Sequence, residues 1–163
     1  MFDIRSTQFP ECFPVDIMHL FYENIAPYML RHWMGSFFKE SNLNNQPYLL
    51  SNKQWNEIGA DMDVIKKSIP ADFGCPPRNI FHHHNGYKVE EWSFWITLYS
   101  LPLLKDRLPL TYLKGWSLFV KAVRLCQKRK LSLEDQCEIR NLLLQFYLHY
   151  ERYVTTHYLF YIL

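Results

Sequence analysis

Apolar residues recur at the spacing of an α-helix between residues 16 and 33, with polar residues between them. Asp16 stands at the N-terminal end of this stretch, where a short acidic side chain can cap the first turn. Pro27 interrupts the pattern because its ring removes a backbone N–H and crowds the preceding turn. Gly35 follows as a stop signal. The pattern therefore predicts one bent helix, or two helices in succession.

The same spacing predicts further helices downstream, separated by segments without periodicity. They are expected at about residues 51–69 with Ser51 at the start, at 89–100 with Pro102 ending or kinking the helix, at 109–128 with Pro109 in the first turn, and from the cap Ser132 through Tyr150. Residues 39–47 are rich in amide side chains and residues 70–86 in Pro and Gly. We expect both to be irregular connectors without a regular element.

No stretch shows the sustained alternation of a half-buried strand, so the sequence predicts an all-α fold of five to six helices with long irregular connectors. The expected arrangement is one helical domain over 1–163, divided into an extended segment (1–15), helices one and two (16–69), a Pro/Gly/His connector (70–86) and helices three to six (87–163). The expected core consists of Trp33, Trp55, Trp92, Trp95, Trp116, Phe119, Leu143 and Phe146.

Composition agrees with a single domain that has a sizeable core. The chain has 163 residues, of which 48% are hydrophobic and 17% aromatic. Charged residues interrupt every apolar stretch, so no membrane-spanning segment is predicted, and the N-terminus lacks the apolar run of a signal peptide. The four cysteines form no C-x-x-C pair, which favours reduced thiols inside the cell: Cys12, Cys75, Cys126 and Cys137.

Asp16 and His19 lie three residues apart and would face the same side of a helix. They are our candidate catalytic and metal-binding pair, and the alternative is that Asp16 only caps the helix. The run His82–His84 could supply imidazoles to a metal, but no neighbouring ligand completes a set, so a solvated loop is the alternative. Glu90 and Glu91 are explained by the helix dipole, and a catalytic carboxylate is the alternative.

Charge is distributed unevenly along the chain, although the formal net charge is only +2. Between Lys105 and Lys130, eight Lys or Arg residues stand against the single acidic residue Asp106. Helical projection places four of the cations within one sector of about 80°: Lys114, Lys121, Arg124 and Lys128. Such a face could follow nucleic-acid phosphates, or it could simply be a solvated helix face.

The sequence contains no nucleophile elbow, Walker loop, dinucleotide-binding glycine pattern or H-E-x-x-H motif. It therefore supports none of the enzyme classes that these motifs mark.

Asp16-Ile17-Met18-His19, followed by YENI, resembles the D-x-M-H block of CACTA (En/Spm-type) DDE transposases and their domesticated or decayed relatives. CPPRNI at residues 75–80 resembles the Pro- and Asn-bearing segment of that family, and YKVEEWSFWITLYSLPLL at residues 87–104 resembles the amphipathic helix that follows it. The resemblance covers most of the chain, and the D-x-M-H block is its most specific part.

This resemblance implies that the chain corresponds to the helical insertion of an RNase H-like transposase, truncated at both ends. Asp16 and His19 match the motif at which the insertion leaves the catalytic core. An intact family member would use Mg²⁺ or Mn²⁺ held by acidic residues on a β-sheet. Because this sequence predicts no such sheet, the catalytic acids are expected before Met1 and after Leu163, and no cofactor is expected in this fragment.

Three functions remain open at the level of the sequence. The first is a transposase-derived nuclear protein, inactive as an enzyme, that binds DNA weakly and non-specifically. The second is a helical protein–protein interaction module that self-associates or acts as a scaffold, which exposure of Tyr158, Phe160 and Tyr161 would favour. The third is a metalloenzyme that uses Asp16, His19 and the loop 82–84.

Overall fold

Helices and loops make up the described part of the chain. The computed structural model describes residues 16–37, 46–69 and 76–155, and it has no strand within these ranges. The helical runs are η1 (Met18–Ile25) with α1 (Ala26–Trp33); α2 (Asn52–Ser68); α3 (Ile80–His83) with η4 (His84–Gly86); α4 (Val89–Phe94) with η5 (Trp95–Tyr99) and α5 (Ser100–Leu104); α6 (Leu110–Cys126); and α7 (Leu133–Tyr150) with η6 (Glu151–Thr155). The predicted all-α fold is confirmed.

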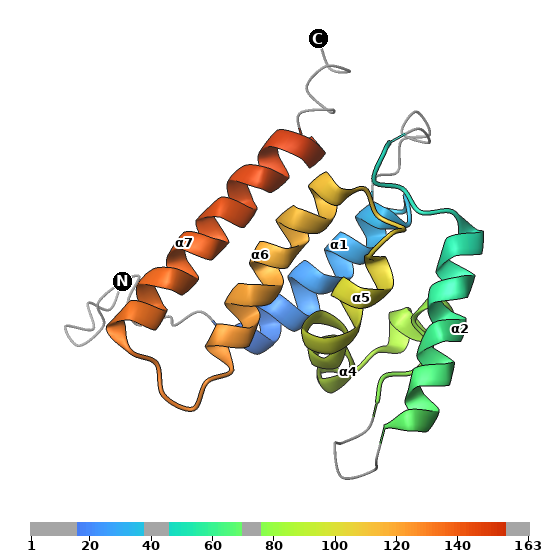
Figure 1. Cartoon of the computed structure of the whole chain (residues 1–163), viewed down its shortest axis with the longest axis horizontal. Coiled ribbons are helices and arrows are strands. Elements are labelled where there is room, and N and C mark those ends of the chain that lie inside the picture. The colour runs from blue at the N-terminus through green and yellow to red at the C-terminus, as the bar shows by residue number, and fades with distance from the viewer. Residues whose placement is uncertain (1–15, 38–45, 70–75, 156–163) are drawn as a thin grey trace, which may run out of the picture.

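The helices enclose one aromatic core. Figure 1 shows α7, α6 and α1 side by side, with α2 at the opposite edge of the molecule from α7. In the centre, the rings of Trp33 and Trp116 meet edge to face with centroids 5.1 Å apart. Phe119 lies 5.0 Å from Trp116 and packs edge to face on Phe21 at 5.3 Å. The first helical run and α6 thus share the centre of the core.

The predicted core is confirmed for its six residues on α1, α2, the α4–α5 run and α6, which are all buried: Trp33, Trp55, Trp92, Trp95, Trp116 and Phe119. It is wrong for Leu143 and Phe146, which are only partly buried and pack against the core from outside. The reason is that α7 lies on the surface, where none of its residues is buried. One face of α7 packs on α6, and leucines on its other face are exposed.

Local signals place several helix ends where the sequence predicts them. Ser51 accepts the Gln54 N–H, and Ser132 accepts the Asp135 N–H at 3.0 Å, so both form capping boxes. Gly35 follows α1 with a φ of 72°, in the left-handed region that glycine adopts without strain. These capping residues are confirmed because they depend on neighbours within a few positions.

Pro102 acts differently from the prediction. The run that was expected to end or kink near Ser100 continues through Pro102 to Leu104, because the chain first widens into the π-helical segment η5. In a π-helix the backbone N–H of each residue donates to the carbonyl five residues earlier, so the donor to the Thr97 carbonyl would be residue 102. Pro102 has no N–H to donate. That carbonyl instead accepts hydrogen bonds from Nε (2.9 Å) and Nη2 of Arg124 on α6. At Pro27 the structure agrees with the predicted division: η1 ends at Ile25, and α1 begins at Ala26 with Pro27 in its first turn.

The prediction of no regular element in residues 70–86 is wrong for its described part, 76–86. The short helix α3 starts at Asn79, whose side-chain oxygen accepts the Phe81 N–H at 3.1 Å. The Asn79 amide also donates to Asp63 on α2 at 2.8 Å. Asn79 lies directly on Gly59, where a Cβ would come within 2.2 Å of its side-chain oxygen. Contacts with α2 therefore stabilise a helix too short to form alone.

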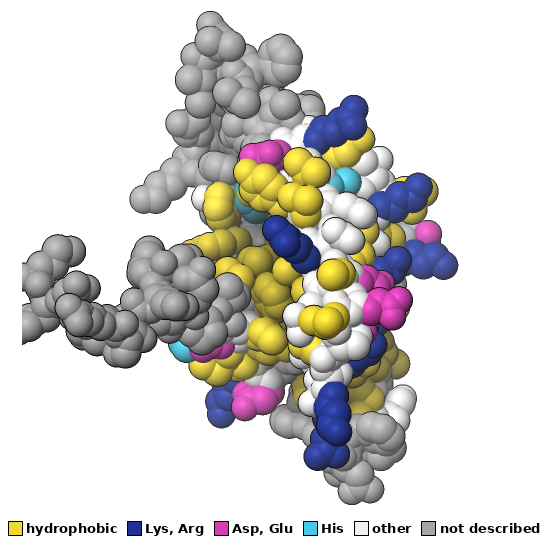
Figure 2. All heavy atoms as spheres, turned by 90° about the vertical axis from the view of Figure 1, so that its left-hand side faces the viewer, with side chains coloured by type: hydrophobic (Ala, Val, Ile, Leu, Met, Phe, Trp, Pro, Cys, Tyr) yellow, Lys and Arg dark blue, Asp and Glu magenta, His cyan; other side chains and the backbone are white. Residues whose placement is uncertain are grey.

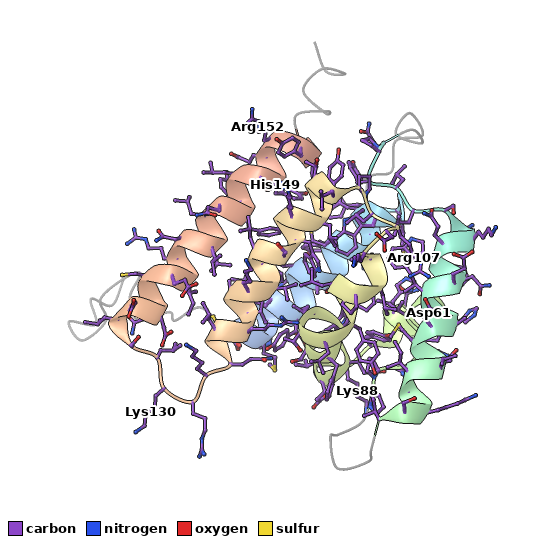
Figure 3. The ribbon with its side chains drawn as sticks, in the orientation of Figure 1. Asp61, Lys88, Arg107, Lys130, His149 and Arg152 are labelled. Carbon is purple, nitrogen blue, oxygen red and sulfur yellow. The ribbon has the colours of Figure 1, made fainter. Side chains whose placement is uncertain are left out.

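A second close approach joins α6 and α7. A Cβ on Gly115 would lie 2.2 Å from Nδ1 of His149, so the absence of a side chain lets α7 pack close to α6. His149, labelled in Figure 3, lies between the two helices, and its Nε2 is 2.9 Å from the Thr111 carbonyl. α6 ends at Cys126, so Lys128, predicted to be on this helix, belongs to the connection to α7.

Other expectations fall partly outside the described residues. Cys126 and Cys137 are free thiols, and Cys12 and Cys75 lie outside the described ranges. The same holds for the extended segment 1–15 and for Tyr158, Phe160 and Tyr161. Among the helices that the structure describes, none has the length and apolar content needed to cross a bilayer.

Candidate functional site

Asp16 and His19 contact each other at the start of the first helical run. Nδ1 of His19 lies 2.7 Å from Oδ2 of Asp16, and both side chains are more than half exposed. The other carboxylate oxygen of Asp16 accepts the Met18 N–H at 2.8 Å. The backbone carbonyl of Asp16 accepts the Leu20 N–H. Asp16 therefore caps the helix and orients His19 at the same time. The two roles that the sequence left open, a helix cap and a functional pair, are compatible in this geometry.

A second carboxylate extends the pair. Nε2 of His19 lies 3.6 Å from Oε2 of Glu23, one turn further along the helix. The hydrogen bond to Asp16 raises the pKa of His19, with smaller help from the charge of Glu23. In return the His19 hydrogen bond lowers the pKa of Asp16. The arrangement favours a charged imidazole between two carboxylates.

We expect His19 to titrate above the ordinary histidine pKa when its imidazole is followed by NMR. Asp16→Asn should bring the pKa of His19 down, because it removes the charged acceptor at 2.7 Å. Glu23→Gln is the matched control and should lower it less, since Glu23 acts only through its charge at longer range. Any stability that the pair adds is complete below the unfolded-state pKa of His19 and is lost as pH rises through the folded-state pKa. Equal effects of the two variants would contradict this geometry.

The metal prediction gains no third ligand from the described residues. Among them, no group of three or more His, Cys, Asp or Glu side chains is arranged to hold a metal ion. His82 and His83 are exposed, and Nδ1 of His84 lies 2.9 Å from the Ile80 carbonyl of its own helix. A metalloenzyme that uses all five residues would require the three imidazoles to converge with Asp16 and His19. The described structure does not bring them together.

A polar hollow of about 280 Å³ nevertheless joins the first helical run to the histidine loop. Glu23 and Arg31 line it from one side, and His84 and Asn85 line it from the other. The first helical run and the histidine loop therefore share a cavity, which Glu23 and His84 line. Asp16 and His19 are not among its lining residues. Sequence reasoning missed Glu23, although its position four residues after His19 on a helix could have indicated it.

The basic face of α6 is divided by its partners. Lys114 and Lys121 are exposed, and neither takes part in an ion pair within the described ranges. Arg124 is committed to the Thr97 carbonyl. Lys128 pairs with Asp135 at 2.6 Å, and this hydrogen bond lowers the pKa of Asp135 to about 2. Only two of the four predicted phosphate ligands are thus uncommitted.

The wider basic segment follows the same division. Arg107, which follows α5, pairs with Asp61 on α2 at 2.8 Å. Figure 3 shows the two side chains pointing toward each other. Lys105, at the end of α5, is exposed and has no ion pair with a described residue. Figure 3 also shows Lys130 on the connection between α6 and α7, at the outer edge of the molecule. We name Lys105, Lys114 and Lys121 the basic rim.

Two residues of the basic rim, Lys105 and Lys114, line the seam between α6 and the α4–α5 run, which lie beside each other. Two hollows follow this seam, of about 480 and 330 Å³. Each helix contributes one face, because the lining residues recur every three or four positions. Leu98 is 55% exposed and Leu110 is 63% exposed. We name this feature the seam groove, and its apolar floor consists of Phe94, Leu98, Leu101, Pro102, Leu110 and Leu113.

Arg78 and Glu91 form a two-pronged ion pair that the sequence did not indicate. Glu91 accepts from Nε and Nη2 of Arg78 at 2.8 and 2.7 Å and from the backbone N–H groups of Arg78 and Lys88. Nη2 of Arg78 also reaches the Gly86 carbonyl at 2.5 Å. The Arg78 hydrogen bonds lower the pKa of Glu91 to about 2. Glu91 therefore holds the loop 78–88 onto α4, which is a structural role that the sequence did not indicate.

Comparison with known protein families, with curated proteins and with solved structures finds no match for this chain. The resemblance to CACTA transposases therefore stays a prediction.

Proposed function

We propose that this chain is a non-catalytic, transposase-derived helical domain that binds DNA phosphates weakly and without sequence preference, and that it acts in the nucleus. The observation that carries the DNA-binding part is the basic rim. Its three lysines are exposed, and no described carboxylate neutralises them. Lysines that replace condensed counterions on phosphates give affinity without reading bases.

Arg124 and Lys128 already have partners within the protein, so fewer cations are available for DNA and the expected salt dependence of binding is smaller. Four phosphate contacts would give a slope of log K against log salt concentration near −3.6, at about 0.9 per phosphate on duplex DNA. Three contacts by the basic rim give a slope of about −2.7 by the same relation. Arg124 is also a poor site for a test, because its replacement would leave the Thr97 carbonyl without the guanidinium.

We expect fluorescence anisotropy with a labelled duplex to give this slope across a salt series, for any duplex sequence. Replacing Lys114 and Lys121 together by glutamine should reduce the slope by about two units and weaken all duplexes alike. Lys53→Gln with Lys66→Gln on α2 is the matched control, since both are exposed lysines away from the basic rim. A slope near zero, or equal losses in the two double variants, would refute binding by the basic rim.

The non-catalytic part of the proposal rests on the family resemblance, because an intact member would hold its metal ions with acids on a β-sheet, which this sequence does not predict. Incubation of transposon-end duplexes with Mg²⁺ or Mn²⁺ is expected to leave them uncut. Cleavage that disappears in Asp16→Ala would overturn this part of the proposal.

A protein-interaction module remains the second candidate. It is favoured by the outer face of α7, where Leu133, Leu144 and Leu148 are 81%, 55% and 54% exposed. Figure 2 shows apolar side chains gathered on this side of the molecule among Lys, Arg and acidic side chains. Contiguous apolar patches on a surface mark protein interaction sites.

A further inference from the structure

The seam groove combines two properties that a phosphate-binding surface does not need together. Its floor is apolar, with Leu98 and Leu110 more than half exposed. Its described lining contains cations but no carboxylate, because Lys105, Lys114 and Arg124 are the charged members. A phosphate backbone would pair with the cations and leave the leucines in water. A ligand that covers both must carry apolar and acidic groups on one scaffold.

The direction of the groove narrows the scaffold further. The two hollows follow one seam between two antiparallel helical segments: residues 101–105 face residues 110–117, and residues 93–98 face residues 124–127. Lys121 lies on the same face of α6, between the stretches that line the two hollows. An elongated apolar seam flanked by positive charges is the geometry that receives an amphipathic helix, whose apolar face packs on the seam while its flanks meet the charges.

We propose that the seam groove binds an acidic amphipathic helix of a partner protein, whose leucine-type residues cover Leu98 and Leu110 and whose carboxylates pair with the basic rim. Charge complementarity selects this occupant, since every charged residue that lines the groove is positive. The inference goes beyond the proposed function and does not depend on it. Because both ligands use Lys114 and Lys121, the helix and DNA compete for one surface.

The test uses the full chain and a labelled synthetic peptide of about five helical turns, with leucines at i, i+3, i+4 and i+7 and glutamates elsewhere. Its matched control has the same composition in scrambled order, which keeps the charge and removes the apolar stripe. We expect anisotropy to show binding of the amphipathic peptide only, and the unlabelled peptide to displace labelled duplex. Equal binding of the scrambled peptide would overturn the proposal, because charge alone would then explain it.

Two pairs of variants separate this proposal from DNA binding. Leu98→Ser with Leu110→Ser should weaken the peptide at least about tenfold, by lost apolar burial, and leave the DNA affinity unchanged. Both leucines are exposed, so the fold is expected to persist, and circular dichroism checks this. Lys114→Gln with Lys121→Gln should weaken both ligands. Peptide binding without DNA binding refutes only the proposed function, whereas DNA binding without peptide binding refutes only this inference.

A second copy of the chain is the other occupant that the experiment detects. Sedimentation velocity of the chain alone is expected to show no association that depends on Leu98 and Leu110. A dimer that dissociates in the Leu98→Ser, Leu110→Ser variant would assign the seam groove to self-association and overturn the proposed acidic partner.

Discussion

Replacing Trp116 by alanine is expected to lower the free energy of unfolding by about 3 to 5 kcal/mol, the range for large aromatic residues removed from a core. Trp116 is 1% exposed and lies between Trp33 and Phe119, so its removal leaves a cavity that the neighbouring rings cannot fill. Its indole Nε1 also donates to the Ser100 hydroxyl at 2.8 Å, a buried hydrogen bond that links α6 to α5. The first helical run, α5 and α6 all lose contacts at once.

Denaturant unfolding followed by circular dichroism measures this loss. Leu144→Ala on the outer face of α7 is the control, because Leu144 is 55% exposed and should cost less than about 1 kcal/mol. Trp116→Phe should fall between the two, since it keeps part of the apolar volume but loses the donor to Ser100. A change below about 1 kcal/mol in Trp116→Ala would show that the core is arranged differently.

Glu91→Gln is expected to cost about 2 to 3 kcal/mol at pH 7. The substitution removes the charge that faces Arg78, and its amide places a donor against Nη2 of Arg78 or the Lys88 N–H, which also donate. The estimate stays below the 3 to 5 kcal/mol of a fully buried pair because the Arg78 side chain is 43% exposed, while that of Glu91 is 11% exposed. The exposed neighbour Glu90→Gln provides the control and should change little.

The same contact predicts a pH dependence with a definite sign. The pKa of Glu91 falls from 4.5 to about 2 in the folded chain, so the carboxylate binds protons less readily when folded than when unfolded. Its stabilisation is complete above the unfolded pKa and is lost as pH falls toward about 2. At about 1.4 kcal/mol per pKa unit, the shift corresponds to roughly 3 kcal/mol. The stability difference between wild type and Glu91→Gln should therefore shrink between pH 5 and pH 2, and a constant difference would contradict this assignment.

Local signals made the helices predictable. Ser51, Ser132 and Gly35 act on neighbours within a few positions, and the apolar spacing identifies the buried tryptophans because each helix has one face toward the core. The prediction missed α3 because that helix depends on Asn79 contacting Gly59 and Asp63 on α2. No local pattern contains such a contact.

The same limit applies to the candidate functional residues, whose positions on a helix were predictable but whose tertiary contacts were not. Helical projection could place Lys114 and Lys121 on one face of α6, but it could not show that Arg124 serves the Thr97 carbonyl, 27 residues away in the sequence. In a π-helical pattern the donor to that carbonyl would be residue 102, which is a proline without an N–H, and Arg124 donates to it instead. The Asp16–His19 contact was predictable because it spans a single turn, while its function remains a hypothesis.

The placement of α7 on the surface has a consequence for how the molecule opens. No residue of α7 is buried, whereas its C-terminal end is tied down by the hydrogen bond from Tyr150 to His32 at 2.6 Å and by the buried Val154 in η6. Segments with few buried contacts separate from the fold at a lower free energy than global unfolding requires. Its amides should therefore exchange with solvent faster than those of α6, starting from the Leu133 end. Only an opening that reaches His149 at the far end of α7 exposes the face of α6 around Gly115, a surface that the closed molecule never presents.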